Sequence, residues 1–166
     1  PTSLFCQDQE EKKISERLFF GGNLGMQFGD ITIIDIAPMA GIHVTEKFDA
    51  GLTLRYTYYK EKLYNFETSM YGGSVFGSYR VFENILAHLE IEPLNLSSPL
   101  ITVDSQGYVT EINNSNRYWI TSVLAGGGYR QPLGEKSAAY FLVLWNLNET
   151  SDSPYTNPVI RIGFMF

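Results

Sequence analysis

In the last eight residues of the chain every second side chain is large and apolar, while the other row carries a charge, and this pattern limits what they can form. Ile160, Ile162, Phe164 and Phe166 take every second position, and Arg161 lies between the first two. Side chains of a strand point alternately to opposite faces, whereas the apolar face of a helix repeats every ~3.6 residues. The stretch is therefore predicted to be a strand with one apolar face, which must be covered by a second layer of protein or by an apolar solvent.

The same alternation recurs along the chain and predicts further strands. We expect strands over residues 18–28, 32–44, 48–59, 71–81, 87–92, 118–130, 139–147 and 159–166. A chain of 166 residues is long enough for eight strands of membrane-spanning length. No apolar run reaches the roughly 18 residues that a membrane helix needs, so any membrane span has to be made of strands.

The charged residues decide which face of these strands points inward. Those that we assign to the lumen lie opposite the apolar rows: Asp35, Arg55, Arg80, Glu90, Glu92, Arg130 and Arg161. A soluble barrel that holds a ligand would have the reverse arrangement, with an apolar interior and a polar exterior. The sequence therefore predicts an all-β fold, an eight-stranded antiparallel up-and-down transmembrane β-barrel with lipid around it. Several outward aromatic residues would suit the interfacial girdles of such a barrel: Tyr56, Tyr58, Tyr71, Tyr79, Tyr129 and Trp145.

The inward charges are predicted to form a lumen charge network. An eight-stranded barrel is just wide enough for its own side chains, and buried charges need partners. A cluster near the periplasmic end, together with Glu90 or Glu92, is also compatible with a hydrolytic or metal site: His43, Arg80, His88 and Arg130. We prefer the paired network, and we expect no catalytic residue, no cofactor and no metal ion.

One strand, over residues 118–130, has an ambiguous inward face. If Arg130 points inward, Trp119 and Tyr129 point outward, but Ile120 and Leu124 then also point inward. The period-two pattern alone leaves this choice open.

The lengths of the connections predict the orientation of the barrel. Those at 45–47, 82–84 and 131–136 are short, and those at 60–68, 96–116 and 148–158 are longer, as expected for periplasmic turns and extracellular loops. The exception is a short outer hairpin at Gly29–Asp30. Both termini are then periplasmic.

The longest connection, at 96–116, is predicted to carry a small hairpin that stands above the barrel. Its apolar residues form a candidate partner-binding loop: Leu100, Ile101, Val103, Tyr108, Val109 and Ile112. The alternative is a hairpin that packs on itself and covers the mouth of the barrel.

Three stretches resemble a known family. They are residues 18–25 (LFFGGNLG), residues 125–134 (AGGGYRQPLG) and residues 160–164 (IRIGF). They are similar to the small outer-membrane β-barrel proteins common in Bacteroidota, over about residues 18–166. The resemblance implies an eight-stranded outer-membrane barrel and carries over no catalytic motif. The departure is at the end of the chain, where Met165–Phe166 stands in place of a terminal Gly-Phe.

The start of the chain is interpreted as a separate segment. Residues 1–17 would be an N-terminal periplasmic segment, and residues 18–166 the barrel domain. Residues 4–6 would suit the tail of an export signal. Cys6 is the single cysteine, so an intrachain disulfide is excluded; as a lipid-anchor site it is disfavoured by the bulky Phe5 before it.

Three classes of function fit an integral barrel of the bacterial outer membrane. The preferred one is a non-enzymatic structural or accessory subunit of an outer-membrane complex, or a surface-recognition protein that acts through its extracellular loops. Its partners would be outer-membrane lipid or lipopolysaccharide and other envelope proteins. A small pore and a lipid-modifying enzyme are the alternatives. The net charge of −6 disfavours nucleic acid as a partner.

Overall fold

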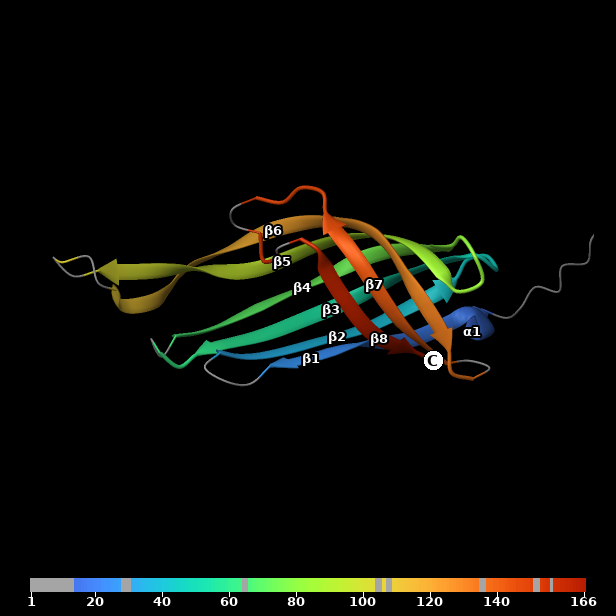
Figure 1. Ribbon diagram of the computed structural model, residues 1–166, viewed down its shortest axis with the longest axis horizontal. Helices are drawn as coiled ribbons and strands as arrows, with labels where there is room; N and C mark the ends of the chain where they lie inside the picture. The colour runs from blue at the N-terminus through green and yellow to red at the C-terminus, as the bar shows by residue number, and fades with distance from the viewer. Residues whose placement is uncertain are drawn as a thin grey trace, which may run out of the picture.

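The protein is a closed, all-antiparallel β-barrel in which each strand pairs with its neighbours in sequence and the last pairs with the first (Figure 1). The computed structural model describes residues 14–27, 31–63, 66–103, 106, 109–134, 137–150, 153–155 and 157–166. The strands are β1 Leu18–Gln27, β2 Ile31–His43, β3 Phe48–Glu61, β4 Phe66–Arg80, β5 Ile85–Val103, β6 Val109–Pro132, β7 Ala138–Asn146 and β8 Val159–Met165. The predicted eight-stranded barrel is therefore confirmed.

A single turn of helix, α1 Ile14–Arg17, precedes β1. Among the described residues, no helix is long and apolar enough to cross a membrane. The rest of the expected N-terminal segment, residues 1–13, lies outside the described residues.

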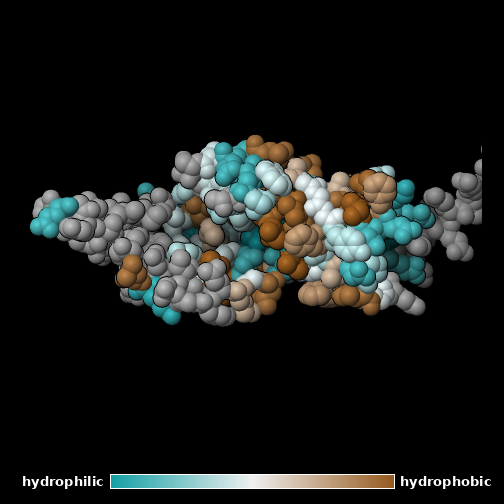
Figure 2. All heavy atoms as spheres, viewed as in Figure 1, coloured by the Kyte–Doolittle hydropathy of each residue, from teal (hydrophilic) through white to brown (hydrophobic). Residues whose placement is uncertain are grey.

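The outer wall of the barrel is apolar, as the alternation predicts. In β8, burial alternates residue by residue, with Arg161 buried and Ile160 and Ile162 exposed. In β3, Leu54 is 68% exposed while its neighbour Arg55 is only 7% exposed. Figure 2 shows apolar side chains spread over the visible face of the barrel. The charged side chains of these strands point into the small interior, and the apolar side chains face outward.

In β6 the alternative with Arg130 pointing inward is the one that the structure adopts. Ser122 and Leu124 are buried, at 1% and 0% exposure, whereas Trp119 and Tyr129 are exposed on the outer wall. The pattern was ambiguous because Leu124 is an apolar residue on the inward face.

The longest connection is mostly strand: the hairpin predicted within it is present, but the predicted bounds of the loop, residues 96–116, are wrong. β5 continues to Val103 and β6 begins at Val109, with register shifts near Ser97 and Thr102. The hairpin predicted inside that loop is the end of a ribbon that is continuous with the barrel wall and projects beyond the other strands (Figure 1).

The connection after β3 is also shorter than expected. β3 ends at Glu61 and β4 begins at Phe66, so most of the polar stretch 60–68 belongs to paired strands. Strand ends that are rich in polar residues have the same composition as a loop. The predicted end of β3 is therefore too early and the predicted start of β4 too late. The Gly29–Asp30 turn and Phe28 lie outside the described residues.

One half of the interior is apolar, which the alternation did not reveal. A buried cluster spans several strands: Phe19, Phe76, Leu86, Leu124, Ala138, Tyr140, Leu142, Leu144, Val159 and Met165. β7 contributes most of it, because its sequence AAYFLVLWN is apolar on both faces. A strand without a polar face gives no contrast between inside and outside.

The barrel closes through a short seam between β1 and β8. Gly21 pairs with Met165 and Gly22 with Phe164, and Phe20 and Phe166 exchange backbone hydrogen bonds of 2.8 Å. Small residues permit this close approach: a Cβ atom on Gly163 would overlap the Gly22 carbonyl oxygen and the Tyr140 hydroxyl. Gly22 also has a φ of 151°, which L-residues with side chains rarely adopt.

We expect Gly163→Ala to weaken the closure of the barrel. The added methyl group has to displace the β1 backbone at the seam, which should cost about 1–3 kcal/mol of unfolding free energy. The measurement is the temperature at which the compact gel band of the unboiled protein converts to the unfolded band. Gly25→Ala is the matched control, because its Cβ atom would meet only the Asp35 Cβ atom, at 3.5 Å. Equal conversion temperatures for the two variants would contradict the role of Gly163.

Candidate functional site

The interior holds a connected set of ion pairs, which we call the lumen charge network and define as Asp35, Arg55, Glu90, Glu92 and Arg161. On one side, Arg55 of β3 joins β2 to β5. Its Nη1 donates to Asp35 Oδ2 at 2.7 Å, and its Nε donates to Glu92 Oε1 at 2.8 Å. Arg55 and Glu92 are buried, and Asp35 is partly buried. Charge-assisted bonds of this length are the strong kind, and they offset part of the cost of burying the charges.

Arg161 of β8 completes the network from the opposite wall. Its Nη2 donates to Glu92 Oε2 at 3.0 Å, and its Nη1 donates to the two carboxylate oxygens of Glu90 at 2.6 and 2.5 Å. Glu92, which is fully buried, thus accepts from both guanidinium groups. The network therefore crosses the barrel and ties β8 to β5, two strands that are not adjacent in the wall.

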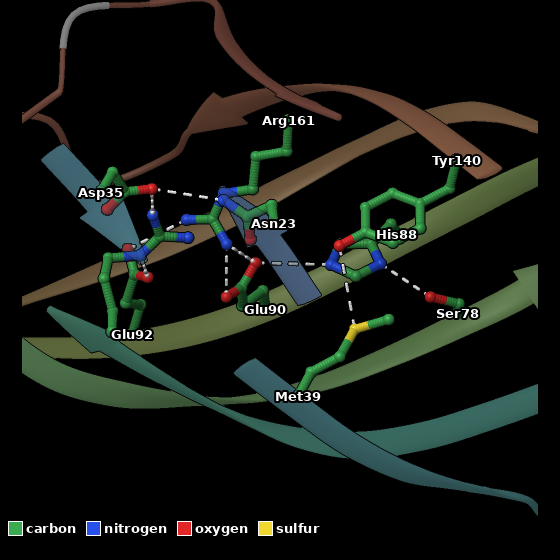
Figure 3. Close-up of polar contacts among 10 residues, drawn as sticks. Asn23, Asp35, Met39, Ser78, His88, Glu90, Glu92, Tyr140 and Arg161 are labelled. Atoms are coloured by element: carbon green, nitrogen blue, oxygen red, sulfur yellow. Dashed lines mark hydrogen bonds and ion pairs between the residues drawn. The ribbon is translucent and has the colours of Figure 1, made fainter. Parts of the chain in front are cut away.

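Further polar groups extend the network at both ends, as Figure 3 shows for Asn23, His88 and Ser78. Beside Asp35, Asn23 Nδ2 and Thr57 Oγ1 donate to the carboxylate at 3.2 and 2.6 Å. Beyond Glu90, His88 Nε2 lies 3.4 Å from Glu90 Oε2, and His88 Nδ1 lies 2.7 Å from Ser78 Oγ. Within the described part of the network these contacts satisfy the carboxylates, while Arg55 Nη2 is buried without a hydrogen-bond partner.

Two of the predicted members, Arg80 and Arg130, lie outside this network. The Arg80 Nη2 atom is 4.0 Å from Asp49 Oδ2, and Asp49 also contacts His43 Nδ1 at 2.5 Å. Arg130 Nε donates to the Met165 sulfur at 3.4 Å. These residues sit near the short turns, where β2, β4 and β6 end or β3 begins, while the network lies farther along the barrel.

The arrangement of Ser78, His88 and Glu90 has the residue types of a nucleophile, a base and an acid. A reaction would require a substrate beside Ser78. The cavity there is lined by these residues together with apolar side chains such as Phe76 and Leu142, and its volume is about 40 Å³. That is far smaller than the roughly 300–1,000 Å³ of typical ligand pockets. Glu90 is already engaged by Arg161, so the geometry accounts for these groups as satisfied buried polar residues.

The connection between β7 and β8 contributes a further residue to the interior. The Tyr155 ring centroid lies 5.9 Å from the Arg161 guanidinium carbon, and the Tyr155 hydroxyl oxygen is buried. This burial raises the pKa of the Tyr155 phenol, which therefore stays neutral. A cation beside an aromatic ring gains a favourable contact, and the ring helps to fill the lumen above the network.

Several of these residues were missed by sequence reasoning. Asp49 could have been found, since it lies on the inward row of β3 together with Thr53 and Arg55. Tyr155 could not have been predicted as an interior residue, because it belongs to no strand and the alternation pattern does not cover it. Among the described residues, no group of His, Cys, Asp and Glu is arranged to hold a metal ion.

The candidate partner-binding residues lie along the projecting ribbon. Leu100, Ile101 and Val103 belong to β5, and Val109 and Ile112 belong to β6, with Ile101 opposite Ile112 and Val103 opposite Val109. For these positions the structure describes the backbone, and Tyr108 lies outside the described residues. The ladder therefore brings five of the six predicted residues onto one two-stranded ribbon.

Comparisons with known proteins add little to this geometry. No protein-family model matches the chain, and no curated protein matches its sequence. The chain is similar to the N-terminal β-barrel domain of Pseudomonas aeruginosa OprF, with 11% identity and a TM-score of 0.44 over 90% of this chain and 94% of that chain. It is also similar to a designed transmembrane β-barrel, with 14% identity and a TM-score of 0.42 over 90% and 93%. The resemblance to the Bacteroidota barrels stays a prediction.

We expect Arg161→Leu to destabilise the barrel strongly. The substitution leaves the Glu90 and Glu92 carboxylates buried without their shared cation, and breaking one partner of a buried pair costs about 3–5 kcal/mol. Urea unfolding of the purified protein in detergent measures the change. The outward Leu54→Ile is the control and should change the unfolding free energy by less than about 1.5 kcal/mol. Equal stability of the two variants would mean that the inner and outer faces are exchanged.

Proposed function

We propose that this protein is a non-enzymatic integral barrel of the bacterial outer membrane that recognises other envelope proteins through its projecting β5–β6 ribbon. In this role it is an accessory subunit of a larger complex or a surface-recognition protein. The outer wall and the ribbon support this role.

The outer wall supports the membrane location. Large apolar side chains face outward from every strand of the barrel: examples are Leu24, Ile36, Leu54, Val75, Leu89, Trp119, Phe141 and Ile162. A monomeric soluble protein rarely exposes so continuous an apolar surface. A closed barrel satisfies its backbone hydrogen bonds within the wall, which is the condition for strands to cross a hydrocarbon layer. An apolar wall around a charged interior is the arrangement of outer-membrane barrels.

The filled interior of the barrel argues against ion conduction and against catalysis. The lumen charge network crosses it in the middle, and the apolar cluster fills it beside β7. Eight strands leave an interior just wide enough for side chains or one small ligand, and an enzyme needs room for its substrate beside the polar groups. These properties favour the accessory or recognition role over the pore and the lipid-modifying enzyme.

The ribbon carries the proposal of recognition. The last ladder pair of β4 with β5 is Tyr71 with Asn95, and the first of β6 with β7 is Leu124 with Asn146. β5 and β6 continue to pair with each other as far as Val103 and Val109. Beyond the barrel, each of these two strands therefore has one edge without a ladder partner among the described strands.

A two-stranded ribbon is marginally stable alone in water, and its free edges are templates for another strand. An extended segment of a partner could add to either edge, with backbone hydrogen bonds supplying affinity and side-chain pockets supplying specificity. The apolar residues predicted for this segment, among them Leu100, Ile101 and Ile112, are of the type that a partner would bury.

The membrane location is tested by the behaviour of the expressed protein. We expect it to sediment with the outer-membrane fraction, to require detergent for extraction, and to migrate faster on a gel when unheated than when boiled. Leu54→Arg should impair folding into vesicles by about 2–4 kcal/mol, because a cation then faces hydrocarbon. Recovery of a folded, monomeric protein without detergent would refute the membrane location.

The recognition role is tested by removing the ribbon. Replacement of residues 98–113 by a short Gly-Ser linker should leave the heat-dependent gel shift intact, because the barrel ladders end before these residues. Partners that are recovered with the tagged wild-type protein from its native outer membrane should be lost. The same linker inserted into the turn at 81–84, at the opposite end, is the control. A partner that remains bound to the ribbon-deleted barrel would place the contact elsewhere.

A further inference from the structure

Arg117 lies on the outer wall of the barrel and is held there by three neighbouring groups. Its Nε donates to the Asn95 side-chain oxygen, and its Nη2 donates to the backbone oxygens of Ser69 at 2.8 Å and of Asn95 at 3.0 Å. The guanidinium carbon lies 4.6 Å from the centroid of the Tyr71 ring. Asn95 is only 6% exposed, so the acceptor that orients the guanidinium group is itself buried.

The neighbours of Arg117 place it at a defined depth on the wall. The ladders connect Tyr71 to Asn95 and Asn95 to Trp119, and the Tyr71 and Trp119 rings meet edge to face at 6.4 Å. Both rings are exposed on the outer wall. Toward the short turns the wall becomes aliphatic, at Val75 and Ile91. Toward the ribbon, the residue next to Ser97 in the ladder is Arg117.

This order matches the layers of a membrane interface. Aliphatic side chains face hydrocarbon, Tyr and Trp side chains lie at its boundary, and cations lie among the headgroups. Arg117 is thus one step outside the aromatic level, at the height of lipid phosphates. This step rests on the proposed membrane location.

The charge of Arg117 is left for a ligand outside the chain. Among the side chains that the structure describes, no carboxylate pairs with it, whereas nearby Lys60 is paired with Glu67 at 3.3 Å. Its hydrogen bonds within the described part of the chain use Nε and Nη2, which leaves Nη1 as a further donor for a ligand. Guanidinium groups bind phosphate oxygens well, and a group that is already oriented loses little entropy on binding.

We propose that Arg117, supported by Tyr71 and Asn95, is a binding site for the phosphate headgroup of an anionic membrane lipid. Trp119 beside it would contact the glycerol or sugar region below the phosphate. The site is on the lipid-facing wall and is independent of the lumen charge network.

Quenching of Trp119 fluorescence by brominated lipids tests the site. The chain has two tryptophans, so Trp145→Phe leaves Trp119 as the single reporter. The barrel is folded into phosphatidylcholine vesicles that contain one-fifth phosphatidylglycerol, with the bromine on either lipid. We expect phosphatidylglycerol to be enriched about fivefold beside Trp119, the effect of one cation at a membrane surface. Arg117→Gln should abolish the enrichment.

Lys62→Gln is the control, since it removes one exposed cation beyond the end of β3 and should keep the enrichment. If Arg117→Gln fails to fold, the wild-type protein in 1 M salt should lose most of the enrichment, because screening acts over a few ångströms there. Equal quenching by the two lipids in the wild type at low salt would overturn the proposal. So would an Arg117→Gln variant that keeps the lipid preference but loses a protein partner, which would assign Arg117 to the protein interface. No quenching by either lipid would instead refute the membrane location.

Discussion

The ion pairs of Arg161 are the contact on which the rest of the barrel depends. β8 is short, and its seam with β1 consists of a few pairs around Gly21 and Gly22. A seam of that length is a weak point in a closed sheet, because every ladder bond contributes only about 1 kcal/mol net. Arg161 adds a second attachment, across the lumen, from β8 to Glu90 and Glu92 on β5. The lumen charge network is therefore part of what closes the barrel as well as what fills it.

The interior of the barrel is filled by charged pairs in one part and by apolar side chains in the other. Toward β2, β3 and β5, charged groups are paired, and toward β7, apolar side chains pack against one another. Burial of the carboxylates is tolerated because guanidinium groups reach them from two walls, while the apolar cluster contributes the hydrophobic stabilisation that a charged lumen lacks. Such a divided interior leaves little continuous space, so the proposed recognition role falls to the exterior and the ribbon.

The sequence predicts the fold well wherever a strand has two unlike faces. In β3 and β8, the alternation of Leu54 with Arg55 and of Ile160 with Arg161 reveals both the strand and its inner face. The contrast between the faces is weaker in β7, where Leu142 and Phe141 are both apolar although one is buried and the other exposed. The sequence predicts which charged residues point inward, but not which of them pair with each other. Arg80 and Arg130 point inward as predicted, yet they lie too far along the barrel axis to reach Glu90 and Glu92. Axial position depends on strand register and tilt, which alternation does not encode.

The ribbon and the Arg117 site are linked by geometry. Arg117 is near the base of the ribbon, and the step from residue 117 to residue 109 spans eight residues of β6 at about 3.3 Å each, or at most about 26 Å. If Arg117 is held at the level of the lipid phosphates, the tip of the ribbon lies clear of the phospholipid headgroups. An added strand at its free edges would then belong to a partner outside the bilayer, because an open edge in hydrocarbon would leave backbone groups unpaired at a cost of several kcal/mol each. A fixed lipid contact at the base of the ribbon would also restrict the motion of this marginally stable two-stranded element. Its edges would then be presented to a partner in a more defined orientation.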